Sequence, residues 1–240
     1  FPFEPEYYAG RGFDVEFVGH PLLDLARPGT DRAGMCAELG FDPARPIVAV
    51  LPGSRPNELH GTVPTLVSAL SIIGRGQPGT QFLVARAPHL RSELIAPLGA
   101  SREPVRIVEG RADDVLNAAD VVITASGTAT VQTAIHEKPM VIVYRLSPIS
   151  YRLGKPFVRV TNYGMVNLVA GERVVPELIQ DGFTPEAVAR ETLRYFREPD
   201  HAAATRARLR EVHRRLGAPG ASARVAARVL EVCDASRRPT

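Results

Sequence analysis

Residues 121–145 constrain the fold of this 240-residue chain more than any other segment. An apolar run, Val121–Ile123, has the character of a fully buried strand, and small residues follow it. A helical pattern then starts, with Ser126 as its expected N-cap, and Pro139 ends it before a second buried strand, Met140–Tyr144. In such a unit the helix begins at the carboxyl end of a parallel sheet. Its unpaired amides and the positive end of its dipole form a site for phosphate there.

The rest of the chain alternates apolar strands and helices in the same way. A buried strand, Ile47–Leu51, leads through a turn into a helix that runs to about Ile73. Further strands are expected at 81–86, at 105–108 and within 157–168, and further helices at 89–98, at 113–119, from 147, from 184 and over 199–233 with a break near 217–220. This order predicts an α/β fold, a Rossmann-like doubly wound parallel sheet with its ligand beyond the carboxyl ends of the strands.

The first 25 residues differ from this alternation and predict an interdomain linker. Pro2, Pro5 and Pro21 disfavour helix there, and an extended segment follows Gly12. We therefore expect a linker at 1–25, the end of a missing N-terminal domain, and a Rossmann-like domain with C-terminal helices at 26–240. The chain has no initiator Met and starts within a motif-like segment, which predicts that it is part of a longer protein.

Charge and cysteine content narrow the function classes. Arginines gather in the last quarter of a chain of net charge +3, which fits either a solvated helix face or a surface for anionic lipid headgroups. Basic residues are not interleaved with aromatic ones, so we expect no nucleic-acid partner. Cys36 and Cys233 lie far apart, which favours a reducing compartment over a disulfide framework. Ligand spacings typical of metal sites are absent, and no apolar run is long enough to span a bilayer.

Two turns are candidates for phosphate contact. In the first, residues 51–55, Gly53 permits a tight turn whose amides, with Ser54, could approach an anion, although an ordinary βα turn explains it equally well. In the second, Gly127 has no Cβ to keep a diphosphate away, and Thr128 can donate a hydroxyl. The alternative for the second turn is that Ser126 only caps the helix.

Asn167 and the segment 175–180 form a third candidate. Glu177 and Gln180 are three residues apart and would share one face of a helix, where a carboxylate can accept both hydrogen bonds of a ribose diol. The alternative is a solvated helix start. His20 and His136 are candidate general bases, although a lone histidine is more often a packed or surface residue.

Together these segments resemble the lipid-A-disaccharide synthases, a family of bacterial GT-B glycosyltransferases. The likeness covers essentially the whole chain in seven segments: FPFEPEYY at 1–8, FVGHPLLD at 17–24, LPGSR at 51–55, ASGTAT at 125–130, KPMVIVYRLSP at 138–148, NLVAGERVVPELIQ at 167–180 and GAS at 220–222. The resemblance implies two Rossmann-like domains that face a cleft, of which this chain is the C-terminal, nucleotide-sugar-binding one. It also implies transfer of 2,3-diacylglucosamine from its UDP donor to 2,3-diacylglucosamine 1-phosphate, with release of UDP and no metal or cofactor.

The resemblance also assigns roles to residues. It implies that Ser126, Gly127 and Thr128 face the diphosphate, that Arg55 meets the charge that develops on the β-phosphate, that Glu177 takes the ribose hydroxyls, that Gln180 and Asn167 take the sugar or phosphates, and that the backbone of Tyr144, Arg145 and Leu146 meets uracil. The general base is expected on the missing domain. This chain alone is expected to bind UDP weakly and to transfer nothing.

Partners and rival functions complete the expectations. The resemblance implies a cytoplasmic enzyme, peripheral on the inner membrane, and leaves a homodimer open. One rival is another GT-B enzyme of UDP-N-acetylglucosamine, such as a 2-epimerase or the lipid II-forming transferase. The other is a noncatalytic nucleotide-binding or interaction module.

Overall fold

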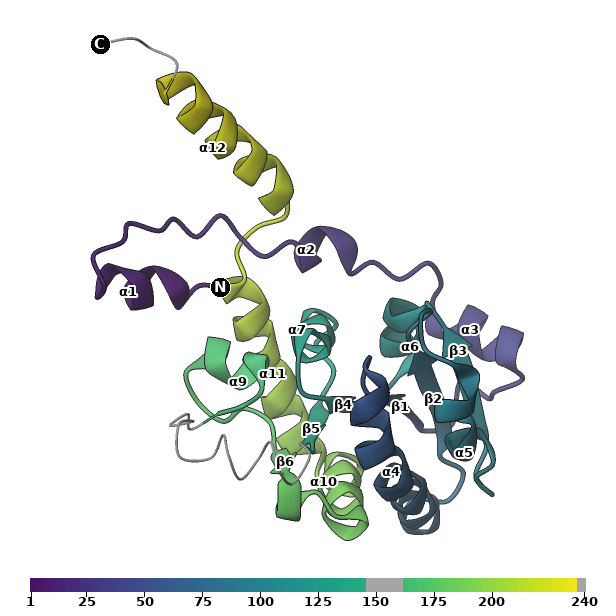
Figure 1. Ribbon diagram of the computed structural model, residues 1–240. Coiled ribbons are helices and arrows are strands. Elements are labelled where there is room, and N and C mark those ends of the chain that lie inside the picture. Colours follow the sequence, from purple (N-terminus) through teal and green to yellow (C-terminus); the bar gives the residue numbers. More distant parts are fainter. Residues whose placement is uncertain (146–161, 237–240) are drawn as a thin grey trace.

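A six-stranded parallel sheet carries the helices of this chain on both faces (Figure 1). The structure is a computed structural model, and it describes residues 1–145 and 162–236. The strands are β1 (Ile47–Leu51), β2 (Gln81–Arg86), β3 (Val105–Glu109), β4 (Val121–Ala125), β5 (Met140–Tyr144) and β6 (Glu177–Ile179). The predicted fold class is confirmed.

The strand order β3-β2-β1-β4-β5-β6 places a reversal of direction between β1 and β4. The chain builds outward from β1 through β2 to β3, returns to the centre, and builds outward again from β4. Val50 of β1 pairs with Val84 of β2 on one side and with Ile123 of β4 on the other. At such a reversal the two connecting loops diverge, and the crevice that opens between them is where doubly wound sheets bind ligands.

Alternation of side chains along the strands builds two cores, one on each face of the sheet. Ile47 and Ala49 of β1 pack on one face, and Val48 and Val50 on the other, all completely buried. The first core is covered by α3 (Arg32–Leu39), α6 (Ala112–Ala118), α7 (Thr128–Ile135), α9 (Met165–Ala170) and α11 (Pro199–Arg215). The second is covered by α4 (Pro56–Gly76), α5 (Ala96–Gly99) and α10 (Pro185–Arg197).

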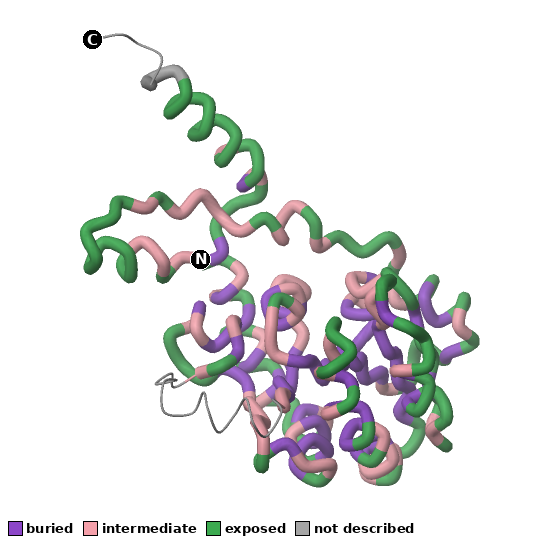
Figure 2. Tube along the Cα trace, viewed as in Figure 1, coloured by how far each residue is buried: buried purple, intermediate pink, exposed green. Residues whose placement is uncertain are grey.

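The first residues of the chain and the last helix lie side by side and project from the sheet domain (Figures 1 and 2). This part contains α1 (Glu4–Ala9) and α12 (Ala221–Ser236), whereas Leu22 and Leu23 of α2 (Leu22–Leu25) pack against the first core. The Arg224 guanidinium donates to the Val18 carbonyl at 2.7 Å, and Arg228 pairs with Glu16 at 2.9 Å. The expectation that proline disfavours helix here is wrong for α1. Pro5 lies in the first turn of this helix, where a missing amide hydrogen costs nothing. The division at residue 25 stays a prediction.

Three further differences from the sequence-based expectations have local causes. The helix expected over 89–98 is a short 3₁₀ turn, η1 (Ser92–Leu94), followed by α5, with Pro97 in the first turn of α5. The sixth strand is β6, and part of the stretch expected to form it belongs to α9. Helix α3 was not expected, and Asp31 caps it by accepting from the Gly34 amide at 2.8 Å. The helix expected from Ser147 lies outside the described residues.

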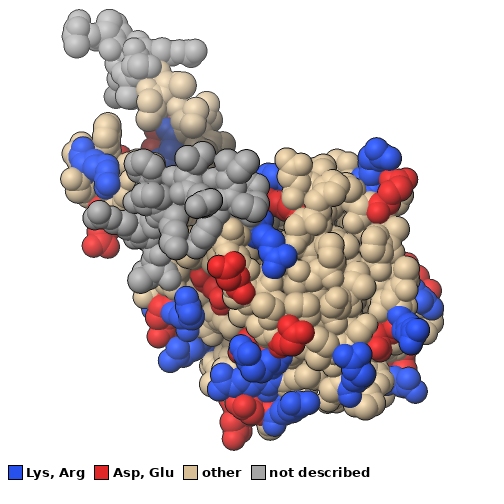
Figure 3. Space-filling model, turned by 60° about the horizontal axis from the view of Figure 1, so that its bottom comes forward, with Lys and Arg blue, Asp and Glu red and all other residues tan. Residues whose placement is uncertain are grey.

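Among the basic side chains of the last quarter that the structure describes, most take part in ion pairs on an exposed surface. On the face that Figure 3 shows, acidic and basic groups lie interspersed. Four arginines of α11 pair with carboxylates: Arg208 with Glu172, Arg210 with Glu137, and both Arg214 and Arg215 with Glu211. This pattern favours the solvated-face interpretation of these arginines. Among the described residues, no helix has both the length and the apolar character that crossing a bilayer requires.

Candidate functional site

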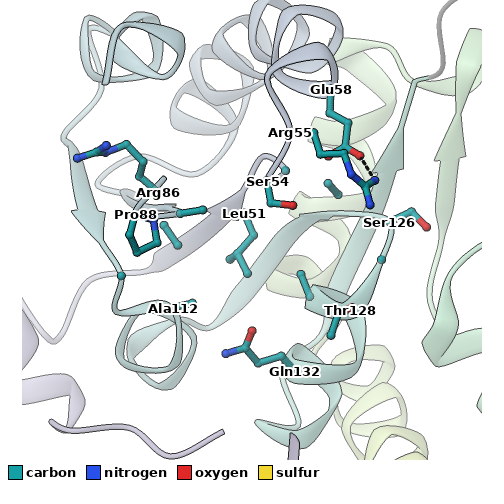
Figure 4. Close-up of a pocket in the computed structure, with 17 residues that line it drawn as sticks. Leu51, Ser54, Arg55, Glu58, Arg86, Pro88, Ala112, Ser126, Thr128 and Gln132 are labelled. Carbon is teal, nitrogen blue, oxygen red and sulfur yellow. Dashed lines mark hydrogen bonds and ion pairs between the residues drawn. The ribbon is translucent and has the colours of Figure 1, made fainter. Parts of the chain in front are cut away.

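A cavity of about 420 Å³ lies at the carboxyl ends of the central strands, where the strand order reverses (Figure 4). The ends of β1, β2 and β4 line it, together with the loop before α6 and the first turns of α4 and α7. Much of the wall consists of alanine, glycine and proline, and Gln132 is a polar side chain within it. Arg55 and Arg86 line the cavity as cations and Glu58 as an anion. A concave site with apolar walls and a few directed polar groups is what a small-molecule ligand requires.

The turn between β1 and α4 forms one side of this site. Gly53 has φ +127°, a backbone conformation that residues with a side chain rarely adopt, so the turn requires glycine. Ser54 is exposed, and its carbonyl lies 2.8 Å from Nε2 of His89. Arg55 is the N-cap residue of α4; its side chain is 77% exposed and pairs with Glu58 at 2.8 Å.

The turn between β4 and α7 forms the opposite side. Gly127 has φ +139° and ψ −159°, a conformation that is essentially restricted to glycine, and α7 begins at Thr128. The first amides of an α-helix have no partner within the helix, and the dipole adds positive potential there. Helix α4 carries Glu58 in its first turn, whereas the first turn of α7 has no acidic residue. The positive end of α7 is therefore the stronger of the two sites for an anion.

The prediction that Ser126 caps α7 is wrong. The N-cap residue is Gly127, and the Ser126 hydroxyl instead donates to the Tyr163 carbonyl at 3.1 Å. Ser126 therefore ties the end of β4 to the segment that leads into α9.

The Glu177 side chain contacts the same backbone segment as Ser126. Its carboxylate accepts from the amides of Tyr163 at 2.8 Å and Gly164 at 2.9 Å, and from Nδ2 of Asn167 at 2.7 Å. The backbone of Tyr163 therefore links Ser126 to Glu177. The predicted site at Ser126 and the predicted site at Glu177 are thus neighbours at the same edge of the sheet. The prediction that Glu177 and Gln180 share one face of a helix is wrong, however. Glu177 lies in β6, and Gln180 begins the 3₁₀ helix η2 (Gln180–Gly182).

Asn167 is completely buried, and both ends of its amide are bonded within the protein. Nδ2 donates to the Val175 carbonyl and to Glu177, while Oδ1 accepts from the amides of Val174 and Val175. These four bonds fill the capacity of an amide. Direct contact between Asn167 and a sugar or phosphate would require one of them to break.

The residues expected near uracil end up on the side of α4 and α10. Tyr144 ends β5 and is half-buried. The Arg145 guanidinium donates to Oγ1 of Thr65 at 3.1 Å and lies 4.8 Å from the centre of the Phe183 ring, so it joins α4 to the loop before α10. Leu146 lies outside the described residues.

Of the two histidines, only His136 lies next to the site. Its Nε2 is 2.8 Å from Oδ1 of Asp113, and the same oxygen accepts from Nε2 of Gln132 at 2.8 Å. His20 packs against Phe1, and burial lowers its pKa. Glu58, Asp113 and Gln132 were not among the predicted site residues. Gln132 lies four residues after Thr128, on the same helix face, which is the signal that identifies it.

Comparison with known proteins gives consistent matches. A model of the lipid-A-disaccharide synthetase family matches residues 1–228. The lipid-A-disaccharide synthase of Geobacter metallireducens is 42% identical over 238 residues, which are 99% of this chain and 62% of that protein. The chain spans about three fifths of the length of the curated relatives that it matches.

Solved structures show the fold at lower identity. A protein assigned as a UDP-N-acetylglucosamine 2-epimerase from Listeria monocytogenes superposes with a TM-score of 0.65 at 16% identity, covering 98% of this chain and 59% of that one. The UDP-GlcNAc 2-epimerase of Neisseria meningitidis, solved with UDP-GlcNAc bound, gives a TM-score of 0.54 at 13% identity, covering 83% of this chain and 48% of that one.

Proposed function

From the premise that this chain belongs to the lipid-A-disaccharide synthetase family, we propose that it is the donor-binding part of a glycosyltransferase. The enzyme would transfer 2,3-diacylglucosamine from its UDP donor to 2,3-diacylglucosamine 1-phosphate and release UDP. The observation that carries the proposal is the cavity at the reversal point of the sheet, flanked by the uncompensated positive end of α7.

The diphosphate of UDP would lie against the first turn of α7. Gly127 presents no Cβ toward the cavity, and the amides and hydroxyl of Thr128 follow it, so several donors converge on one anion. Gly53 and Ser54 line the facing turn. Arg55 is largely free of protein contacts apart from Glu58, and a guanidinium in that position can move to a phosphate.

We place the nucleoside in the cavity rather than at Glu177, because of volume and hydrogen-bonding capacity. The cavity extends from α7 toward the loop before α6, where Pro88, Gly110 and Ala112 form flat, apolar walls suited to a base. Glu177 already accepts three hydrogen bonds, which leaves its carboxylate one free acceptor position and not the two that a ribose diol requires. Gln132 retains a free amide oxygen on the cavity side.

With the nucleoside in the cavity, the sugar of the donor would extend toward the segment 163–180. Glu177 has one acceptor position left there for a hydroxyl, and Gln180 follows it at the end of β6. Asn167 would act indirectly in this arrangement, because it holds both Glu177 and the backbone at 174–175.

Cleavage of the bond between sugar and phosphate leaves negative charge on UDP. Groups that bind this charge more strongly in the transition state than in the ground state accelerate the reaction. The positive end of a helix supplies about 0.3–1 kcal/mol, and up to about 2 kcal/mol when partly buried. A preorganised donor is worth about 3–4 kcal/mol. We therefore expect Arg55 and the donors at Thr128 to contribute more to the rate than the dipole does, and the base that activates the acceptor to lie on another part of the enzyme.

The rival functions differ in what they predict. The match to the lipid-A-disaccharide synthetase family extends over most of the chain, whereas the epimerases share only 16% and 13% of its residues, so an epimerase activity is the weaker proposal. A noncatalytic interaction module would not need an anion site at the end of α7, whereas a noncatalytic nucleotide-binding module would keep that site and transfer no sugar. Attachment to the cytoplasmic face of the inner membrane and formation of a homodimer remain proposals that come with the family.

Titration of the chain with UDP, UMP and uridine tests this proposal. UDP should bind more tightly than UMP, and uridine most weakly, because the diphosphate meets the donors at α7. Equal affinities, or no binding of UDP, would contradict it. In the complete enzyme, formation of the disaccharide from the diacylated donor but not from UDP-N-acetylglucosamine separates the proposed reaction from the other GT-B activities.

A further inference from the structure

A chain of hydrogen bonds connects the cavity wall to a partly buried carboxylate. Gln132 and His136 are four residues apart on α7, and both donate to Oδ1 of Asp113 in the first turn of α6, each at 2.8 Å. The Asp113 side chain is 21% exposed and that of His136 is 7% exposed, so both are shielded from competing water. Of the three, only Gln132 lines the cavity.

The chemistry of the carboxylate determines how Gln132 is oriented. An ionised carboxylate only accepts hydrogen bonds, so the neighbouring amide must present its N–H to Asp113. The amide oxygen then points the other way, and Figure 4 shows it turned into the cavity. The same reasoning places a proton on Nε2 of His136, because two acceptors cannot form this contact.

Near α7, the polar groups that line the cavity besides Gln132 are mostly donors or hydroxyl groups, which can donate or accept. Arg86 and the first amides of α7 are donors, and the Glu58 carboxylate already pairs with Arg55. For a ligand hydroxyl near α7, Oε1 of Gln132 is an acceptor whose orientation the hydrogen bond to Asp113 fixes. If the amide were reversed, it would present a further donor to a wall that already has several.

We propose that Asp113 and His136 are positioning residues, which hold the Gln132 amide with its oxygen toward the cavity so that it accepts a hydrogen bond from a ribose hydroxyl of the bound nucleotide. This inference rests on the proposed function. It assigns to Asp113 a role beyond the favourable placement of an acid in the first turn of α6.

The test compares UDP with 2′,3′-dideoxy-UDP by calorimetric titration. The unmodified chain should bind UDP about five- to tenfold more tightly, the amount that one hydrogen bond supplies. In Asp113→Asn, the new amide can donate to Oε1 of Gln132 and turn the glutamine around, so the preference should fall toward one. Gln132→Met removes the acceptor outright and should lose the preference in the same way. The matched control is Asp200→Asn, the same change in the first turn of α11, which should retain it.

A reciprocal exchange separates positioning from a purely structural role. Gln132→Glu alone places a carboxylate against Asp113, and like charges there should weaken UDP binding. Gln132→Glu combined with Asp113→Asn restores a donor opposite an acceptor, and the preference for UDP over the dideoxy analogue should return. A structural role for Asp113 predicts that the double variant is no better than either single one.

The outcomes distinguish the two proposals. If the unmodified chain binds no UDP, the proposed function fails. If it binds UDP, but Asp113→Asn keeps the full preference for the ribose hydroxyls, the positioning role is overturned and the proposed function stands. Retention of the preference by Gln132→Met would overturn the inference as well.

Discussion

Replacement of Gly127 by alanine isolates the backbone conformation on which the proposed phosphate site depends. A Cβ at this position would meet no atom within 4 Å, so steric overlap within the protein does not contribute. The cost arises from φ +139° and ψ −159°, which a residue with a side chain adopts at about 1–3 kcal/mol. Alanine also restricts the unfolded chain, which returns about 0.4–1 kcal/mol. The net loss in the free energy of unfolding should therefore be about 1–2 kcal/mol.

The matched control is Gly182→Ala. A Cβ at Gly182 also meets nothing within 4 Å, but the backbone there is not in the left-handed region. This variant should be as stable as the unmodified chain, or more stable by up to about 1 kcal/mol. Urea denaturation followed by circular dichroism measures both. Titration with UDP then shows whether the methyl group at Gly127 blocks the diphosphate, for which we expect at least a tenfold loss of affinity, with none for Gly182→Ala. A Gly127→Ala variant that matches the unmodified chain in stability and UDP affinity would refute the reasoning.

Two further predictions concern charged side chains. Arg55→Ala should lower the turnover of the complete enzyme more than tenfold and change the free energy of unfolding by less than about 1 kcal/mol, since the Arg55 side chain is largely exposed. Arg91→Ala, which removes a comparably exposed arginine that pairs with the exposed Glu93, should change neither. Burial raises the pKa of Asp114, but hydrogen bonds from Arg111 and from the amides of Gly29 and Thr30 outweigh it, and the net pKa lies below the usual range. Asp114→Asn should thus cost about 1–3 kcal/mol at pH 7. Its difference from the unmodified chain should shrink as the pH falls from the usual aspartate pKa of about 4 toward the lower pKa of the folded chain. A difference that does not decrease with falling pH in this range would argue against this account.

Much of the fold could be predicted because strands buried on both faces are continuous apolar runs. Val121–Ile123 and Met140–Tyr144 are of this kind, and the structure places both in the central part of the sheet. The edge strand β6 has only three residues, all half-buried, and its sequence carries no such signal. Its position depends on pairing with β5, which composition does not reveal. Glu177 was therefore assigned to a helix.

The turns that line the cavity could be identified from the sequence, but the hydrogen bonds around them could not. Gly127 and Gly53 were identified correctly as turn residues, since glycine after a buried strand marks a sharp reversal. The partners of Ser126, Asn167 and Glu177 lie 37, 8 and 14 residues away along the chain, in contacts that only the folded arrangement creates. These three side chains, which the sequence suggested as ligand contacts, form hydrogen bonds with the protein backbone instead. The orientation of Gln132 depends on Asp113 of another helix in the same manner.

A crystal structure of this chain with UDP bound tests the central claim most directly. The account predicts that oxygens of the diphosphate accept hydrogen bonds from the first amides of α7, next to Gly127, and that the uridine occupies the cavity with its ribose beside Gln132. A diphosphate bound away from α7, or a uridine seated against Glu177 and Tyr144 with the cavity empty, would contradict it.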